Sequence, residues 1–124
     1  MPEQMKWSYS VQAVRGPTVA GNGVLEVDAY LKLNVTVPAN GTLEVEVLPD
    51  GGGSAQLLVI NPGKPSDKLS YKVDGDDVLL DSPHILIGAG AVGLLAETVG
   101  TLEFKNDGNE DAEISILVGR DATP

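Results

Sequence analysis

Cysteine is absent from this 124-residue chain, which excludes disulfides, thiolate metal sites and a cysteine nucleophile. Long apolar runs are missing too, because no window approaches the roughly 18 consecutive apolar residues of a membrane helix. The first six residues, MPEQMK, lack the charged-then-apolar pattern of a signal peptide. We therefore expect a cytoplasmic or particle-associated (virion-like) protein without a membrane partner.

Basic residues are scarce, with 8 lysines and arginines against 18 acidic residues and a formal net charge of −10. The few basic residues are scattered along the chain, so no basic patch is expected. Such a surface repels a phosphate backbone, which argues against nucleic acid as a partner. The hydrophobic fraction of 42% and the chain length fit one globular domain with a single core.

Aromatic residues make up only 4% of the chain. Trp7 and Tyr9 alternate on one expected strand, and Tyr30 lies on the polar side of another. Because sugar rings stack on aromatic faces, these three residues are the candidates for a carbohydrate site. The simpler interpretation is core packing for Trp7 and an ordinary cross-strand contact for Tyr30.

Alternation of apolar and polar residues is the strongest pattern that is present. From Leu25 to Val37 every odd position is apolar, and the even positions between them are polar or amphipathic. This period of two predicts an extended strand with one buried face. Thirteen residues would span about 40 Å, which exceeds the usual strand length. We therefore expect this stretch to bend or to pass from one sheet to another.

Turn signals divide the rest of the chain. Residues 38–42, PANGT, predict a hairpin between the strand that ends at Val37 and an alternating strand at 43–47. Residues 106–109, NDGN, predict a second hairpin, between strands at 102–105 and 114–118. The segment 55–60 is apolar on both faces, as expected for a central strand.

Together these patterns predict an all-β fold, a single antiparallel β-sandwich or jelly-roll-like domain of about eight strands over residues 1–124. Further short strands are expected at 5–14, 69–73, 78–80 and 85–87. Residues 1–6 are an expected N-terminal arm and residues 120–124 a polar C-terminal tail. Termini of this kind often reach across to a neighbouring subunit.

One glycine motif favours a different class of protein. Gly88, Gly90 and Gly93 form G-x-G-x-x-G directly after an apolar strand, which is the pattern of a dinucleotide-binding loop. That fold requires parallel strands joined by helices, whereas the preceding sequence predicts antiparallel strands. A close backbone approach or a bend at a sheet corner is the interpretation we favour.

The acidic turns supply oxygen ligands of the kind that calcium binds, although neither has the spacing of an EF-hand. Their residues are Asp74, Asp76 and Asp77 in one turn, and Asp107, Asn109 and Asp111 in the other. A calcium site becomes attractive if both turns lie at one end of the sandwich. Turn chemistry alone also explains these residues. His84, the only histidine, has no cysteine or serine elbow to activate, so we expect a structural role for it.

No group of residues forms a recognisable catalytic set, and we expect a protein that is not an enzyme and has no cofactor. The favoured function is structural: a β-domain that associates with itself or docks onto a larger assembly, as in decoration, shell or tail components of virus-like or phage-like particles. A carbohydrate-binding module, assisted by calcium, is the alternative. A dinucleotide-dependent enzyme built on Gly88–Gly93 is the third candidate.

Overall fold

The computed structural model describes residues 3–47, 54–73, 75–95 and 100–121, and it confirms the all-β antiparallel architecture. Its strands, in chain order, are β1 Glu3–Gln12, β2 Thr18–Val27, β3 Ala29–Val37, β4 Gly41–Glu46, β5 Ser54–Pro62, β6 Leu69–Val73, β7 Asp76–Leu79, β8 His84–Ile87, β9 Thr101–Asn106 and β10 Ala112–Asp121. One short helix, α1 (Ala89–Val92), follows β8.

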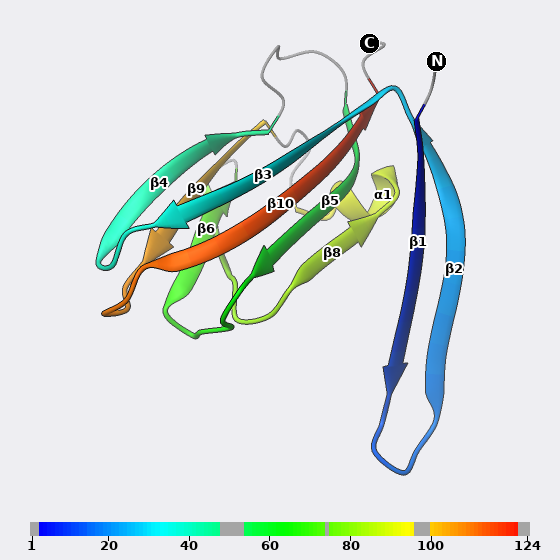
Figure 1. The fold of residues 1–124 in the computed structure, drawn as a ribbon, viewed down its shortest axis with the longest axis horizontal. Helices are drawn as coiled ribbons and strands as arrows, with labels where there is room; N and C mark the ends of the chain where they lie inside the picture. Colours follow the sequence, from blue (N-terminus) through cyan, green and yellow to red (C-terminus); the bar gives the residue numbers. More distant parts are fainter. Residues whose placement is uncertain (1–2, 48–53, 74, 96–99, 122–124) are drawn as a thin grey trace.

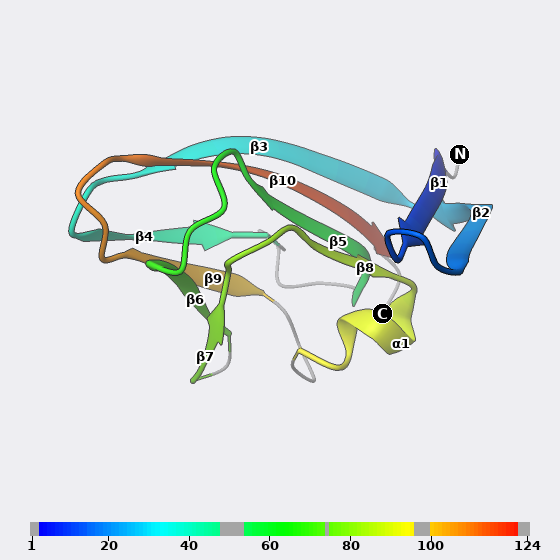
Figure 2. The same cartoon turned by 90° about the horizontal axis from the view of Figure 1, so that it is seen from below.

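Two four-stranded sheets form the sandwich, and Figure 2 shows them as two layers. Sheet I has the strand order β3-β10-β5-β8, and sheet II has the order β4-β9-β6-β7. As expected, the segment 55–60 lies in a central strand, β5, which pairs with β10 on one side and β8 on the other. The described strand pairs are all antiparallel, as meandering and Greek-key chains produce.

The core lies between the two sheets and consists mainly of the inward-facing side chains of the strands in sheets I and II. Its largest fully buried side chains include Tyr71, Phe104, Leu58, Ile60 and Ile116. Alternation places these residues inside, because successive side chains of a strand point to opposite faces. No residue of β1 or β2 belongs to this core.

Both expected hairpins at residues 38–42 and 106–109 are wrong. β3 pairs with β10 in sheet I, whereas β4 pairs with β9 in sheet II, so each turn carries the chain from one sheet to the other. The two turns lie side by side, since Asn40 N donates to Gly108 O at 3.2 Å. Alternation of apolar and polar residues shows which side of a strand is buried, but not which strand lies beside it. Two consecutive strands can pair in one sheet or face each other across the core from two sheets, and here they face each other.

The expected bend in the alternating stretch 25–37 is confirmed. β2 ends at Val27, β3 begins at Ala29, and only Asp28 separates them. Its amide donates to the carbonyl of Arg120 at 2.9 Å, which ties this joint to the end of β10. On the N-terminal side of the joint the chain leaves the sandwich.

β1 and β2 form a separate two-stranded hairpin, which we call the arm (residues 3–27). Their register runs without interruption from Glu3 opposite Val27 to Gln12 opposite Thr18. Figure 1 shows the arm beside the sandwich, with its tip extending beyond the other strands. Residues 3–6, which were expected to be an extended N-terminal segment, are the first part of β1, and Arg120 and Asp121 are the last residues of β10.

Candidate functional site

The arm has one apolar face and one largely polar face, and the apolar face is the candidate interaction site. The register places Met5, Trp7, Tyr9 and Val11 of β1 on the same side as Leu25, Gly23, Gly21 and Val19 of β2, respectively. Toward the tip this face is open: Tyr9 is 44% exposed, Val11 67% and Val19 64%. An apolar sheet face is normally covered by another layer of structure.

Two aromatic rings on this apolar face lie across the glycines of the neighbouring strand. Trp7 lies opposite Gly23 and Tyr9 opposite Gly21, and the rings extend across the partner strand over these glycines. A Cβ atom on Gly23 would lie 2.6 Å from Trp7 Cζ2, so a larger residue there would displace the ring. The two rings are nearly parallel, with an interplanar angle of 14° and centroids 6.0 Å apart. Aromatic residues that cover cross-strand glycines restore the packing that glycine lacks.

The base of the arm rests on the outer face of sheet I. Gly119 of β10 points away from the core, and a Cβ atom there would lie 2.6 Å from Met5 Sδ and 3.1 Å from Val27 Cγ1. Because glycine has no side chain, Met5 and Val27 can pack directly against the backbone of β10 at this position. Met5 and Leu25 are half-buried, whereas the tip residues are exposed, so the cover that the sandwich provides ends near the base.

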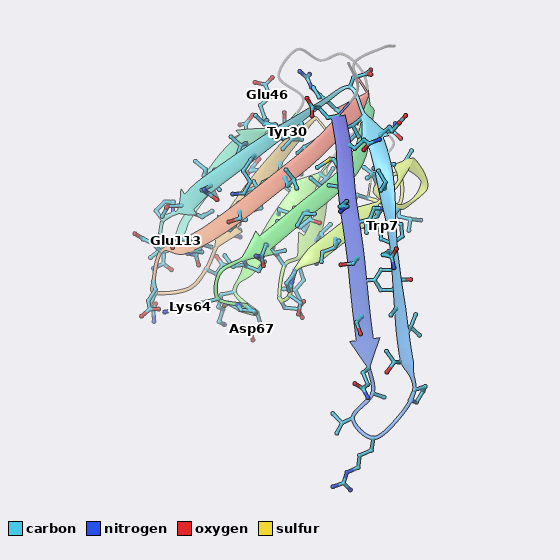
Figure 3. All side chains as sticks on the ribbon, turned by 45° about the vertical axis from the view of Figure 1, so that its right-hand side comes forward. Trp7, Tyr30, Glu46, Lys64, Asp67 and Glu113 are labelled. Carbon is cyan, nitrogen blue, oxygen red and sulfur yellow. The ribbon has the colours of Figure 1, made fainter. Side chains whose placement is uncertain are left out.

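Tyr30, the third aromatic candidate, lies on β3 and is 57% exposed. It stands opposite Gly119 on the outer face of sheet I. Figure 3 shows Tyr30 and Trp7 on different elements, so the sequence-predicted trio divides into a pair on the arm and a single ring on the sandwich.

The two acidic turns do not come together. In the pairing of β6 with β9, Leu69 lies opposite Asn106 and Lys72 opposite Glu103, so residues 75–77 and the turn at 107–111 lie at opposite ends of these strands. Asp74 and the side chain of Asp76 lie outside the described residues. Among the residues that are described, no three His, Asp or Glu side chains are grouped so as to hold a metal ion.

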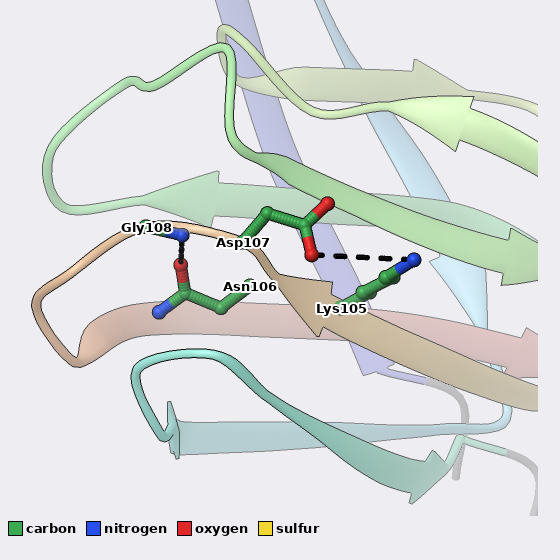
Figure 4. Close-up of polar contacts among 4 residues, drawn as sticks. All are labelled: Lys105, Asn106, Asp107 and Gly108. Carbon is green, nitrogen blue, oxygen red and sulfur yellow. Dashed lines mark hydrogen bonds and ion pairs between the residues drawn. The ribbon is translucent and has the colours of Figure 1, made fainter.

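The turn at 106–111 is organised by a buried amide that the sequence did not single out. Asn106 is only 2% exposed, and its Nδ2 donates to Val37 O at 3.2 Å and to Glu110 O at 2.7 Å. Its Oδ1 accepts a hydrogen bond from Gly108 N at 2.9 Å (Figure 4). Asp111 accepts a hydrogen bond from Ala39 N, while Asp107 lies 4.0 Å from Lys105. These hydrogen bonds, within the turn and to the neighbouring residues Val37 and Ala39, explain its conformation without a bound metal ion.

A wide, open hollow of about 1000 Å³ lies beside this turn. Its charged lining has both signs, because it includes Lys64 and Lys68 as well as Asp107 and Glu110. Mixed charge and wide opening give this hollow no preference for one class of ligand.

His84 has a defined partner in the core. Its Nδ1 lies 2.8 Å from Oη of Tyr71, and the two rings meet edge-on with centroids 5.5 Å apart. The phenol of Tyr71 is protonated at neutral pH and can donate to the imidazole, and burial raises its pKa further, to about 12. The arrangement links β6 to β8 through the interior of the sandwich.

The glycine motif stands in a β-context. Gly88 has a φ of 94°, which favours glycine, and it caps the four-residue helix α1. β8, which precedes the motif, is an edge strand of sheet I, and the next described strand, β9, belongs to sheet II. In a dinucleotide-binding unit, a long helix connects two parallel strands of one sheet. Here the described helix after Gly88 has four residues, and β8 and β9 belong to different sheets.

Within the described parts of the chain, no helix has the length and hydropathy needed to cross a bilayer. No known protein family matches the chain, and searches of characterised proteins and of solved structures give no significant match.

Proposed function

We propose that this chain is a non-catalytic assembly domain that acts through protein–protein contacts, as decoration, shell or tail components of virus-like and phage-like particles do. The observation that carries the proposal is the arm: two ten-residue strands whose apolar face is open toward the tip. A two-stranded hairpin by itself is at best marginally stable in water, so packing against another surface would stabilise it.

Burial of the tip residues supplies the driving force for such a contact. Tyr9, Val11 and Val19 are 44–67% exposed. Complete burial of a fully exposed apolar side chain contributes about 1.5–3 kcal/mol, so covering what is still exposed of each contributes roughly half to two thirds of that. Exposed apolar groups that cluster on one face are typical of interaction sites, whereas scattered ones are ordinary surface.

Sedimentation equilibrium of the full chain, from micromolar to millimolar concentration, tests the proposal. We expect a weight-average mass that rises with concentration above the monomer mass of 12.9 kDa. A monomer over the whole range would contradict the self-assembly that we propose.

A carbohydrate-binding module is the second candidate, and the near-parallel rings of Trp7 and Tyr9 are the observation that favours it. Sugar binding to these rings would quench or shift the fluorescence of Trp7, the only tryptophan. A glycan array followed by fluorescence titration distinguishes the candidates: saturable binding by a chain that remains monomeric supports the carbohydrate module instead of the assembly domain.

A further inference from the structure

We propose that Asn22 is a site of spontaneous deamidation, and that opening of the arm controls how fast it reacts. The reactive sequence is Asn22-Gly23 in β2, and the co-reactant is water. The chain has six asparagines, of which Asn22 and Asn40 are followed by glycine. The inference does not depend on the proposed assembly function, because it concerns the chemistry of a single copy.

The reaction joins the backbone to the asparagine side chain. The backbone nitrogen of Gly23 attacks the side-chain carbonyl carbon, Cγ, of Asn22. The bond from nitrogen to Cγ forms, the bond from Cγ to Nδ2 breaks, and ammonia leaves with the proton that the backbone nitrogen loses. Water then opens the succinimide ring at either carbonyl and gives aspartate or isoaspartate. Glycine has no Cβ atom to hinder the attack, so Asn-Gly sequences react readily.

Packing fixes the glycine of this sequence, while the asparagine is exposed to water. The ring of Trp7 lies over Gly23, and a Cβ atom on Gly23 would lie 2.6 Å from Cζ2 of Trp7. Asn22 lies on the other face of β2, opposite Ser8, and is exposed. The fold that requires glycine at position 23 therefore also keeps the reactive sequence in place.

The pairing of β1 with β2 holds the attacking nitrogen. Near the tip of the arm, Ala13 N donates to Pro17 O at 3.1 Å. Hydrogen-bonded pairs alternate along an antiparallel ladder, and continuing this alternation makes Trp7 and Gly23 such a pair. The nitrogen of Gly23 is therefore engaged in the closed arm, and its attack on Asn22 requires the arm to open.

Opening of the arm costs less free energy than opening of the sandwich. No residue of the arm belongs to the core, and residues 8–20, the half of the arm toward its tip, are all exposed. A two-stranded ladder by itself is marginally stable in water. Elements of this kind open locally at a free energy well below that of global unfolding. The reactive geometry is therefore accessible while the sandwich stays folded.

The second Asn-Gly sequence, Asn40-Gly41, is a matched control in the same chain. Asn40 is exposed, as Asn22 is, and the amide of the following glycine is again engaged, since Gly41 N donates to Pro38 O at 3.0 Å. The two sites therefore share the same chemistry and differ in the structure that must open.

Contacts to the 106–111 turn make this second site harder to open. Asn40 N donates to Gly108 O at 3.2 Å, and Ala39 N donates to Asp111 Oδ1 at 3.0 Å. The first residue of β4 also lies opposite the buried Asn106. Freeing the attacking nitrogen here disturbs the place where the two sheets join, so we expect slower deamidation than in the arm.

The product alters the arm. In isoaspartate the main chain passes through the former side-chain carbon, which lengthens the backbone of β2 by one methylene group. The pairs on the tip side of this point, up to Gln12 opposite Thr18, then lose the register of the pairs near the base. A carboxylate also replaces a neutral amide, so the arm, with two acidic and two basic residues in 3–27, becomes net negative.

Mass spectrometry of the full chain during incubation at mildly alkaline pH tests the inference. Trypsin cleaves after Arg15 and Lys32, so Asn22 and Asn40 fall in different peptides, and an isoaspartyl methyltransferase labels the isoaspartate in each. The same incubation in urea gives both rates in the unfolded chain. We expect the ratio of the Asn22 rate to the Asn40 rate to be about tenfold higher in the folded chain than in urea, which corresponds to a difference of about 1.4 kcal/mol in opening free energy.

Two variants identify what controls the rate. Trp7→Ala removes the ring that covers Gly23 and weakens the arm, so we expect Asn22 to react severalfold faster while Asn40 keeps its wild-type rate. Asn22→Gln requires a six-membered ring in place of the succinimide, so we expect almost no reaction at position 22 and an unchanged rate at Asn40.

Three results would overturn the inference. One is an equal ratio of the two rates in the folded and the unfolded chain, or faster reaction at Asn40. Another is a folded chain that stays unmodified at Asn22 while the unfolded chain reacts. The third is a rate at Asn22 that Trp7→Ala does not raise, which would show that the arm does not control the reaction.

Discussion

Asn106 contributes to this fold more than its place in a turn suggests. It is the buried polar side chain of the described core, and its three hydrogen bonds connect the end of β3 with the 107–110 segment. In the sequence it reads only as an Asn in an Asn-Asp-Gly turn, a residue type that turns favour for backbone reasons. Burial and the long-range partner Val37 cannot be read from local sequence, because they depend on how the two sheets meet.

Replacing Asn106 by alanine should therefore lower the free energy of unfolding. The substitution removes the donor to the carbonyl groups of Val37, at a buried position, and of Glu110, at an exposed one. A buried group that is left unsatisfied costs about 1–3 kcal/mol. Urea denaturation measures the change, and Asn109→Ala, at an exposed position in the same turn, is the control. A loss no larger than that of the control would show that the turn is held by other contacts.

Tyr71 predicts a specific loss of stability at alkaline pH. Its pKa is raised by burial to about 12 in the folded state, against 10.0 when unfolded, so between these values the folded chain binds more protons than the unfolded chain. The free energy of unfolding then falls as the pH rises, by at most about 1.4 kcal/mol per pH unit, and the contribution is complete below pH 10.

Urea denaturation of wild type and Tyr71→Phe between pH 9 and 11.5 measures this contribution. We expect the wild type to lose stability more steeply than the variant above pH 10. The lost hydrogen bond to His84 shifts the variant's stability at neutral pH, which is why the slopes are compared. Parallel slopes would mean that Tyr71 titrates normally in the folded state.

At the scale of elements, alternation predicted where strands run but not which strands pair. Every strand from 25 onward that the sequence indicated is present, yet the turns at 38–42 and 106–109 cross between sheets. The segment 18–24 was missed as a strand because Gly21 and Gly23 interrupt the apolar pattern. The rings of Trp7 and Tyr9 fill those places from the neighbouring strand, a compensation that involves two strands and cannot be seen in either alone.

The arm as an element should open independently of the sandwich. Its strands bond to each other but share no residue with the core, so local opening does not require the core to unfold. In dilute solution we expect the amides of β1 and β2 to exchange hydrogen far faster than those of β5 and β10. If the arm takes part in the proposed self-assembly, higher concentration slows exchange in the arm. Equal protection of arm and sandwich in the monomer would contradict this expectation.

The whole molecule is strongly acidic, although its arm (residues 3–27) is neutral, with Glu3 and Glu26 balanced by Lys6 and Arg15. At neutral pH the net charge of −10 opposes close approach of two copies and favours solubility. Near the isoelectric point of about 4.2 the general repulsion disappears. We expect a solubility minimum there, measured as turbidity against pH, and a shift of that minimum to lower pH in Lys6→Gln, which removes a positive charge. An unchanged minimum would mean that precipitation follows acid unfolding instead of charge neutralisation.

The one-residue connection at Asp28 allows a small rotation at the base of the arm to produce a larger displacement at its tip. About 33 Å of hairpin extends from a single connecting residue, so a rotation of about 10° at the joint moves the tip by about 6 Å without altering any strand pair in either sheet. Neighbours at different spacings or on surfaces of different curvature then remain within its reach. If the chain assembles as we propose, the sandwich can stay rigid while the arm adapts to its neighbour.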